Sequence, residues 1–194
     1  MDSIRGTLNA ITKLDKLPNG LNASNNYGSR ILYISRKKYD FCEYKKILDQ
    51  IMKREELIEL FEKYSDLINM GTSDDAPGND WIDAAEKELL VSFPADYKWF
   101  LNNYGGGDIC GEEIYSIYCL PFNEAVGGDI VYQNMIANNN LETGKIALSN
   151  TDSGEEFFFD TNDMEKVYIS IGNNRQLYAN DFLEYLQKRL FSYV

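Results

Sequence analysis

The 194-residue sequence contains no histidine, only four prolines, and three cysteines, Cys42, Cys110 and Cys119. Without histidine it lacks the commonest general base near neutral pH, the Ser-His and Cys-His nucleophile pairs, and the usual zinc ligand. The cysteines form no CxxC pair, and their odd number does not fit a disulfide framework. Cys110 and Cys119 could meet across a turn, but we expect buried free thiols. The composition predicts a protein that is not an enzyme and binds no metal or cofactor.

Long apolar runs and basic residues are also scarce. No stretch approaches the ~20 apolar residues that span a bilayer, and the first residues lack the apolar run of a signal peptide. Nineteen Lys and Arg face 31 Asp and Glu, which gives a net charge of −12. Such a surface repels nucleic acid and anionic membranes and attracts basic proteins. We expect a cytoplasmic chain with a protein partner, although acidity for solubility alone is the plainer alternative.

The charge divides the chain. Residues 1–50 hold nine basic and five acidic side chains, whereas residues 51–194 hold ten and 26. We interpret 1–50 as a basic amino-terminal extension of unknown role, with a loop over 18–29 and a strand over 30–35. Apolar residues at helical spacing from residue 41 to residue 68 predict a helix with a break near 53–55. Its charged run is read most simply as a solvated helix face.

Two short helices are predicted after the Gly-, Asp- and Pro-containing loop over 71–80. Asn79 or Asp80 is expected to cap the first helix. Pro94 suits the first turn of the second, and Gly105 suits a left-handed stop at its end. The expected buried residues are Trp81 or Ile82, Ala85, Leu89, Leu90, Tyr97, Phe100, Leu101 and Tyr104.

After Gly107 the pattern indicates strands over 114–120, 145–149, 156–160 and 166–171, with a crossing helix over 129–137. A capped amphipathic helix is expected from residue 180. This order predicts the α+β class, with a mainly antiparallel central sheet flanked by helices in a single domain over 51–194.

Three patterns point to catalytic or binding chemistry, but each fits a structural role better. The glycines 105–107 follow a helix and precede Asp108, which is the wrong order and charge for a phosphate loop. Residues 160–165 lack the glycine and glutamate of an EF-hand, so we expect a solvated turn. The pairs Glu112–Glu113 and Glu155–Glu156 would suit glycosidic hydrolysis only if two carboxylates converged in a pocket. A small-molecule enzyme is therefore the weakest hypothesis.

One stretch carries a family pattern. It reads Ile82-Asp83-Ala84-Ala85-Glu86, then Leu89 and Leu90, then Phe93-Pro94-x-Asp96-Tyr97-Lys98-x-Phe100-Leu101, then Asn103-Tyr104-Gly105-Gly106. This resembles the SUKH superfamily, which includes bacterial immunity proteins and the fungal Smi/Knr-type regulators of cell-wall synthesis. Phe93 stands where the usual pattern has leucine. With looser similarity further on, notably over 181–186, the resemblance covers 51–194.

The resemblance implies an α+β domain whose bacterial members neutralise secreted toxins, many of them nucleases. A nuclease carries a basic groove for phosphates, which an acidic protein can occupy. The motif residues expected to be structural are Glu86, Pro94, Tyr97, Phe100, Leu101, Gly105 and Gly106. The residues expected to bind the partner are Asp108, Glu112, Glu113, Tyr115, Glu155, Glu156, Asp160 and Asp163. The alternative is a non-catalytic regulatory scaffold like the fungal members.

Overall fold

The computed structural model describes residues 41–172 and 174–194. The predicted loop over 18–29 and strand over 30–35 lie outside the described residues, as does most of the predicted extension. Residues 50–194 form one compact unit. The elements in chain order are α3 (Phe41–Lys63), β1 (Ile68–Met70), α4 (Asn79–Glu88), α5 (Ala95–Tyr104), β2 (Gly107–Ile109), β3 (Glu112–Ile114), the π-helix η1 (Tyr132–Ala137), the 3₁₀ helix η2 (Asn140–Thr143), β4 (Lys145–Asn150), β5 (Glu155–Asp160), β6 (Asp163–Ile171), β7 (Asn174–Ala179) and α6 (Phe182–Phe191).

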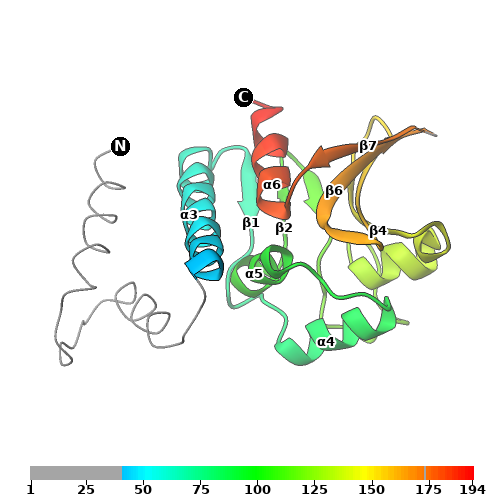
Figure 1. The fold of residues 1–194 in the computed structure, drawn as a ribbon. Helices are drawn as coiled ribbons and strands as arrows, with labels where there is room; N and C mark the ends of the chain where they lie inside the picture. The colour runs from blue at the N-terminus through cyan, green and yellow to red at the C-terminus, as the bar shows by residue number, and fades with distance from the viewer. Residues whose placement is uncertain (1–40, 173) are drawn as a thin grey trace, which may run out of the picture. The chain divides into compact units, whose positions relative to one another are not determined.

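The strands form two antiparallel sheets in the described part of the chain, which confirms the α+β class. One sheet has the order β1-β2-β3 and the other the order β4-β5-β6-β7 (Figure 1). Only residues 161 and 162 form the turn between β5 and β6, with Asp160 opposite Asp163. The sequence therefore predicts a strand-connecting turn at the right place, but residues 163–165 already belong to β6.

The apolar run in β5 is buried on both faces of its sheet. Phe157 and Phe159 belong to the main core, whereas Phe158 lies on the opposite face because side chains alternate along a strand. Phe158 is nevertheless 0% exposed. Its ring stacks on Tyr168 at 6.0 Å, and the charged group of Arg175 lies 4.8 Å from its centroid. Cation–π contacts of this kind explain how a charged outer face can cover an aromatic ring.

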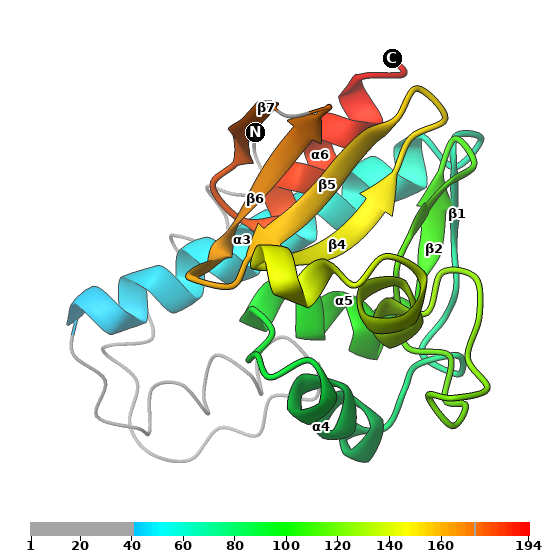
Figure 2. The ribbon, with the colours of Figure 1, turned by 90° about the vertical axis from the view of Figure 1, so that its right-hand side faces the viewer.

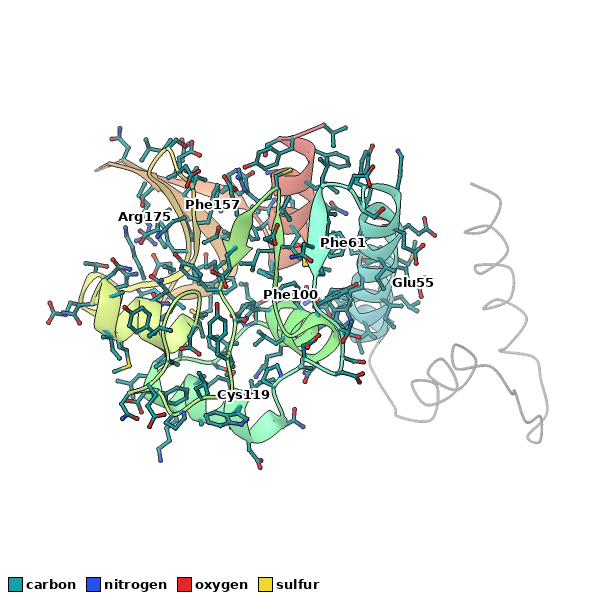
Figure 3. The ribbon with its side chains drawn as sticks, turned by 180° about the vertical axis from the view of Figure 1, so that it is seen from behind. Glu55, Phe61, Phe100, Cys119, Phe157 and Arg175 are labelled. Carbon is teal, nitrogen blue, oxygen red and sulfur yellow. The ribbon has the colours of Figure 1, made fainter. Side chains whose placement is uncertain are left out.

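Helices α5 and α6 pack behind the four-stranded sheet, where aromatic rings fill the core (Figure 2). The Tyr97 ring lies 5.1 Å from Phe182 of α6 and 5.8 Å from Phe159 of β5, both edge to face. These separations lie in the range where aromatic pairs attract one another beyond the burial of their area. Phe100 and Phe157 lie in the same interior (Figure 3).

Helix α3 is continuous from Phe41 to Lys63, so the predicted break near 53–55 is wrong. The apolar spacing changes near residues 53–55 for another reason. Two charged residues in this region bind neighbouring helices. Arg54 forms an ion pair of 2.5 Å with Asp96 of α5, and Lys53 forms one of 2.5 Å with Asp181 at the start of α6. The helix also ends earlier than predicted, and residue 68 begins β1.

The ends of α4 differ in part from the prediction, whereas the end of α5 confirms it. The residue that caps α4 is Gly78, which has no side chain, so neither Asn79 nor Asp80 caps the helix. Leu90 follows the C-cap residue Leu89 at a positive φ of 56° and is 86% exposed, not buried. Gly105 ends α5 at φ 66°, where a Cβ would collide with the Asp75 carbonyl. Only glycine fits there without strain.

The predicted strand over 114–120 is wrong beyond residue 114. Tyr115 donates its N–H to the Leu148 carbonyl at 2.7 Å, and Ser116 forms a single bridge with Asp129. The helix predicted over 129–137 is a π-helix that begins at residue 132. Cys110 and Cys119 are exposed free thiols, not buried ones, and both lie outside the strands at positive φ.

The start of α6 resembles a capping box, except that the return bond goes to the residue before the N-cap Asp181. The Asp181 carboxylate accepts the N–H of Glu184 at 2.8 Å, and the Glu184 carboxylate accepts the N–H of Asn180 at 2.8 Å. Lys188 forms an ion pair of 2.8 Å with Glu184. The hydrogen bond from Lys188, followed by that from Asn180, lowers the pKa of Glu184 to about 2.

This lowered pKa makes a testable contribution to stability. Because the carboxylate is favoured in the folded state, its contribution is complete above the ordinary pKa of 4.5 and is lost as pH falls toward 2. We expect Glu184→Gln to unfold at lower urea concentration than the natural chain at pH 7, with the difference shrinking from pH 4.5 downward. A urea midpoint difference that stayed constant across this window would contradict the assignment.

Candidate functional site

Ten residues from β3, β4, η1, the turns beside them and the carboxyl-terminal tail line a cleft of about 600 Å³. This volume lies within the usual size range of binding pockets. Three of the lining residues are acidic and two are tyrosines. Within the described part of the chain, no Lys or Arg lines the cleft. They are Cys110, Gly111, Glu112, Glu113, Tyr115, Gly127, Gln133, Asn150, Asp152 and Tyr193. We call this the acidic cleft.

A buried arginine holds one wall of the acidic cleft. Arg189 of α6 is 8% exposed and forms an ion pair with the Glu112 carboxylate. It also donates a hydrogen bond of 3.0 Å to the Tyr193 hydroxyl, and its guanidinium lies 4.6 Å from the Phe157 ring centroid. One side chain therefore positions both an acid and a tyrosine of the cleft.

Glu113 is positioned by a second tyrosine. The Tyr118 hydroxyl donates to the Glu113 carboxylate and accepts the N–H of Gly128 at 3.0 Å. A Cβ on Gly128 would collide with that carboxylate, so the glycine leaves the space in which the carboxylate lies. Asp152 differs from both glutamates, because it is exposed and forms no ion pair among the described residues.

The tyrosines in and beside the acidic cleft have raised pKa values, mainly because they are partly buried. Burial, together with the hydrogen bond and charge of Glu113, raises the pKa of Tyr118 to about 12. Burial and a hydrogen bond to Glu112 raise the pKa of Tyr193 to about 12. Burial first, then the charge of Glu113, raises the pKa of Tyr115. The phenols are neutral at pH 7, and the unpaired carboxylates of Glu113 and Asp152 favour a positively charged group in the cleft.

Two buried polar residues fix the segment behind the cleft. Asp129, 1% exposed, accepts backbone N–H groups from Tyr118, Val131 and Tyr132, each at 3.0 Å. Asn134 of η1 accepts the N–H of Ala147 at 2.6 Å and so joins this segment to β4. Sequence reasoning missed both residues, because a buried polar side chain carries no periodic signal.

The structure brings three of the eight predicted partner-binding residues into the acidic cleft: Glu112, Glu113 and Tyr115. Asp108 lies beside it and supports it, because its carboxylate accepts the N–H of Gly111 at 2.9 Å and holds the turn between β2 and β3. These four residues come from one stretch of the chain, so their proximity follows from the hairpin.

The other four predicted residues do not line the cleft. Glu156 forms an ion pair of 2.8 Å with Lys145, and Asp163 forms one of 2.7 Å with Lys166. Asp160 is paired with Arg175. Glu155 accepts a hydrogen bond from Thr151 at 3.4 Å within the turn that precedes β5. Three of these four carboxylates are therefore already neutralised within the sheet.

The cleft also contains polar residues that sequence reasoning missed. Asn150 ends β4, Asp152 lies in the turn between β4 and β5, Gln133 comes from η1, and Tyr193 follows α6. Only Asp152 had a local signal, because Thr-Asp-Ser-Gly is a turn sequence that exposes its acid. The others are brought in by the fold.

Comparison with known families matches residues 79–186 to the family SUKH_6, described as SMI1-KNR4 cell-wall. The chain belongs to the SUKH superfamily. Comparison with the curated proteins gives no match. Within 41–172 and 174–194, no helix is both long enough and apolar enough to cross a membrane.

The SUKH motif residues build the frame that carries the cleft. The Glu86 carboxylate of α4 accepts a hydrogen bond from the N–H of Phe93 at 2.6 Å and forms an ion pair with Lys98 at 2.7 Å. These two contacts fix the turn before Pro94. The buried Tyr97 donates its hydroxyl to the Tyr115 carbonyl at 2.7 Å. Because the Tyr115 side chain lines the cleft, this bond joins the motif directly to the candidate site.

Proposed function

We propose that this SUKH protein is a cytoplasmic immunity protein that binds and neutralises a cognate secreted toxin through the acidic cleft. The observation that carries the proposal is a cleft lined by three carboxylates, of which Glu113 and Asp152 form no ion pair in the described part of the chain. A nuclease is the toxin class that fits this charge best, because its substrate groove must be basic to hold phosphates. The function is binding without catalysis or cofactor.

The cleft would act by charge and by pre-organisation. The acidic surface steers a basic partner toward the protein and speeds the encounter. Arg189 and Tyr118 already hold Glu112 and Glu113 in place, so little side-chain freedom is lost when a partner arrives. Occupation of the toxin's basic groove would then exclude its substrate.

The test reverses two cleft charges that support no core contact. We expect Glu113→Lys combined with Asp152→Lys to weaken binding of a toxin encoded beside this gene by at least about a hundredfold, with loss of protection in co-expressing cells. Calorimetry and growth measure the two effects. The matched control is Glu124→Lys with Glu165→Lys, which makes the same charge change at exposed acids outside the cleft. Equal losses of toxin binding in both double variants would show that only the net charge of the protein matters, and would refute the cleft assignment.

A regulatory scaffold is the alternative, and the description of the matched family as cell-wall favours it. The two functions differ in their partners. A single tight complex with a neighbouring gene's toxin supports immunity. Several cellular proteins recovered with the chain, and no protection against any neighbouring gene product, would support the scaffold.

A further inference from the structure

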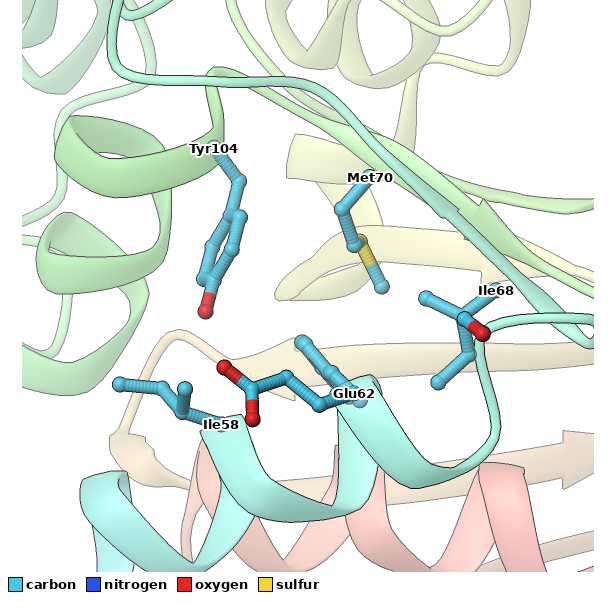
Figure 4. Close-up of a pocket in the computed structure, with 7 residues that line it drawn as sticks. Ile58, Glu62, Ile68, Met70 and Tyr104 are labelled. Atoms are coloured by element: carbon cyan, nitrogen blue, oxygen red, sulfur yellow. The ribbon is translucent and has the colours of Figure 1, made fainter.

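A second hollow lies between α3, β1 and α5 and shares no residue with the acidic cleft. Its volume is about 280 Å³. Figure 4 shows Tyr104 and Met70 pointing toward α3 from the other side of the hollow, with Ile58 and Glu62 on the helix. Ile68 completes the wall beside Met70. We call it the α3 pocket.

The α3 pocket suits one apolar side chain. Apart from Glu62 and Ser65, its lining side chains are aliphatic, aromatic or methionine. Ile58 is 37% exposed at its edge, whereas Phe61 is 7% exposed at its base. Pockets for whole small molecules usually hold about 300–1,000 Å³, and this one falls below that range. Its size fits the pattern of a single anchor residue that a partner inserts.

A row of unpaired acids runs along α3, and one of them, Glu62, lines the α3 pocket. Glu55, Glu59 and Glu62 follow each other at spacings of four and three residues and share one face of α3, and Asp66 lies in the turn after the helix. None of them forms an ion pair within the described part of the chain. Glu55 lies on the outer side of α3 (Figure 3).

Neighbouring basic residues do not relieve this repulsion. Lys63 stands four residues after Glu59, but its ammonium lies over the Tyr64 ring at 4.7 Å. Like charges at helical spacing destabilise a helix by about 0.2–0.5 kcal/mol per pair. Glu62 belongs to the acidic row and also lines the pocket, and after burial its charge contributes to the raised pKa of Tyr104. The site for an apolar side chain and the site for a cation therefore meet at Glu62.

We propose that the α3 pocket docks a partner protein through an apolar side chain flanked by Lys or Arg. The apolar group would fill the hollow, and the flanking cations would meet Glu62 and the adjacent acids. A second copy of this chain is a poor occupant, because it would bring the same acidic row against itself. The charged run of α3 is then a recognition face and not only a solvated one, and this inference does not depend on the function of the acidic cleft.

The test uses a peptide probe on the isotope-labelled full chain. We expect acetyl-Lys-Lys-Phe-Lys-Lys-amide to shift the backbone NMR signals of Ile58, Met70 and Tyr104 in a saturable way. Replacing its phenylalanine with alanine should weaken binding at least about tenfold, because the anchor's apolar burial is lost. Equal binding of both peptides, or shifts spread over all acidic regions, would overturn the proposal.

Two substitutions on the same helix complete the test. We expect Glu62→Lys to weaken the phenylalanine peptide on the order of tenfold. Glu56→Lys makes the same charge change on α3 at an exposed residue outside the pocket and should leave binding nearly unchanged. Equal losses would mean that net charge alone attracts the probe. Self-association seen by ultracentrifugation, with the same signals shifting in the absence of peptide, would instead assign the pocket to a second copy and refute a separate partner.

Discussion

Replacing Tyr97 with alanine is expected to destabilise the fold by about 3 to 5 kcal/mol, a value typical of a large aromatic removed from a core. Tyr97 is 0% exposed, and its ring contacts Phe93, Phe159 and Phe182 at centroid distances of 5.1, 5.8 and 5.1 Å. Its removal takes away a contact that joins α5, β5 and α6 at once. Urea unfolding followed by circular dichroism measures the loss.

Tyr97→Phe separates packing from hydrogen bonding at the same position. It keeps the ring and removes only the hydroxyl that donates to the Tyr115 carbonyl. We expect a loss of about 1 to 3 kcal/mol, the cost of leaving a buried carbonyl without its donor. If the alanine variant lost no more than the phenylalanine variant, the ring would not be the centre of this core.

The second large effect concerns the buried ion pair of the acidic cleft. Arg189→Met leaves the Glu112 carboxylate without its cation, and the two side chains are only 10% and 18% exposed. We expect a loss of about 3 kcal/mol, near the lower end for broken buried pairs because Glu112 keeps some contact with water. Thermal and urea unfolding at pH 7 measure it.

The double variant Arg189→Met with Glu112→Leu distinguishes an unpaired charge from lost packing. With both charges gone, no carboxylate is left unpaired, and we expect most of the lost stability to return. A double variant as unstable as Arg189→Met would show that the arginine acts through its packing on Phe157, whose ring it also covers.

Local signals in the sequence predict the parts of the fold that depend on local chemistry. Pro94 and Gly105 mark the ends of α5 because each restricts the backbone wherever it occurs. The apolar runs of β4 and β5 predict strands, and consecutive residues of both are buried on the two faces of their sheet. The break in α3 was predicted wrongly because Arg54 is a charged residue at this point of the apolar pattern. It is placed there by its ion pair with Asp96 of α5 and does not interrupt the helix.

Short strands and converging sites could not be predicted in this way. β1, β2 and β3 have three residues each, too few for an alternating pattern to be recognised. β7 carries mostly polar, exposed residues and so lacks the apolar signal of a strand. The acidic cleft joins Glu112 to Arg189, 77 residues further along the chain. Only the packed fold brings such residues together.

The origin of the cleft lining has a consequence for how binding specificity can change in evolution. Asp152 lies in a turn and Tyr193 follows the last helix, whereas Tyr97, which fixes the backbone of the cleft, lies in the core. Loop and tail positions tolerate substitution far better than packed ones do. A few changes at the lining could therefore give the same frame a new partner while its folding stability stays almost unchanged.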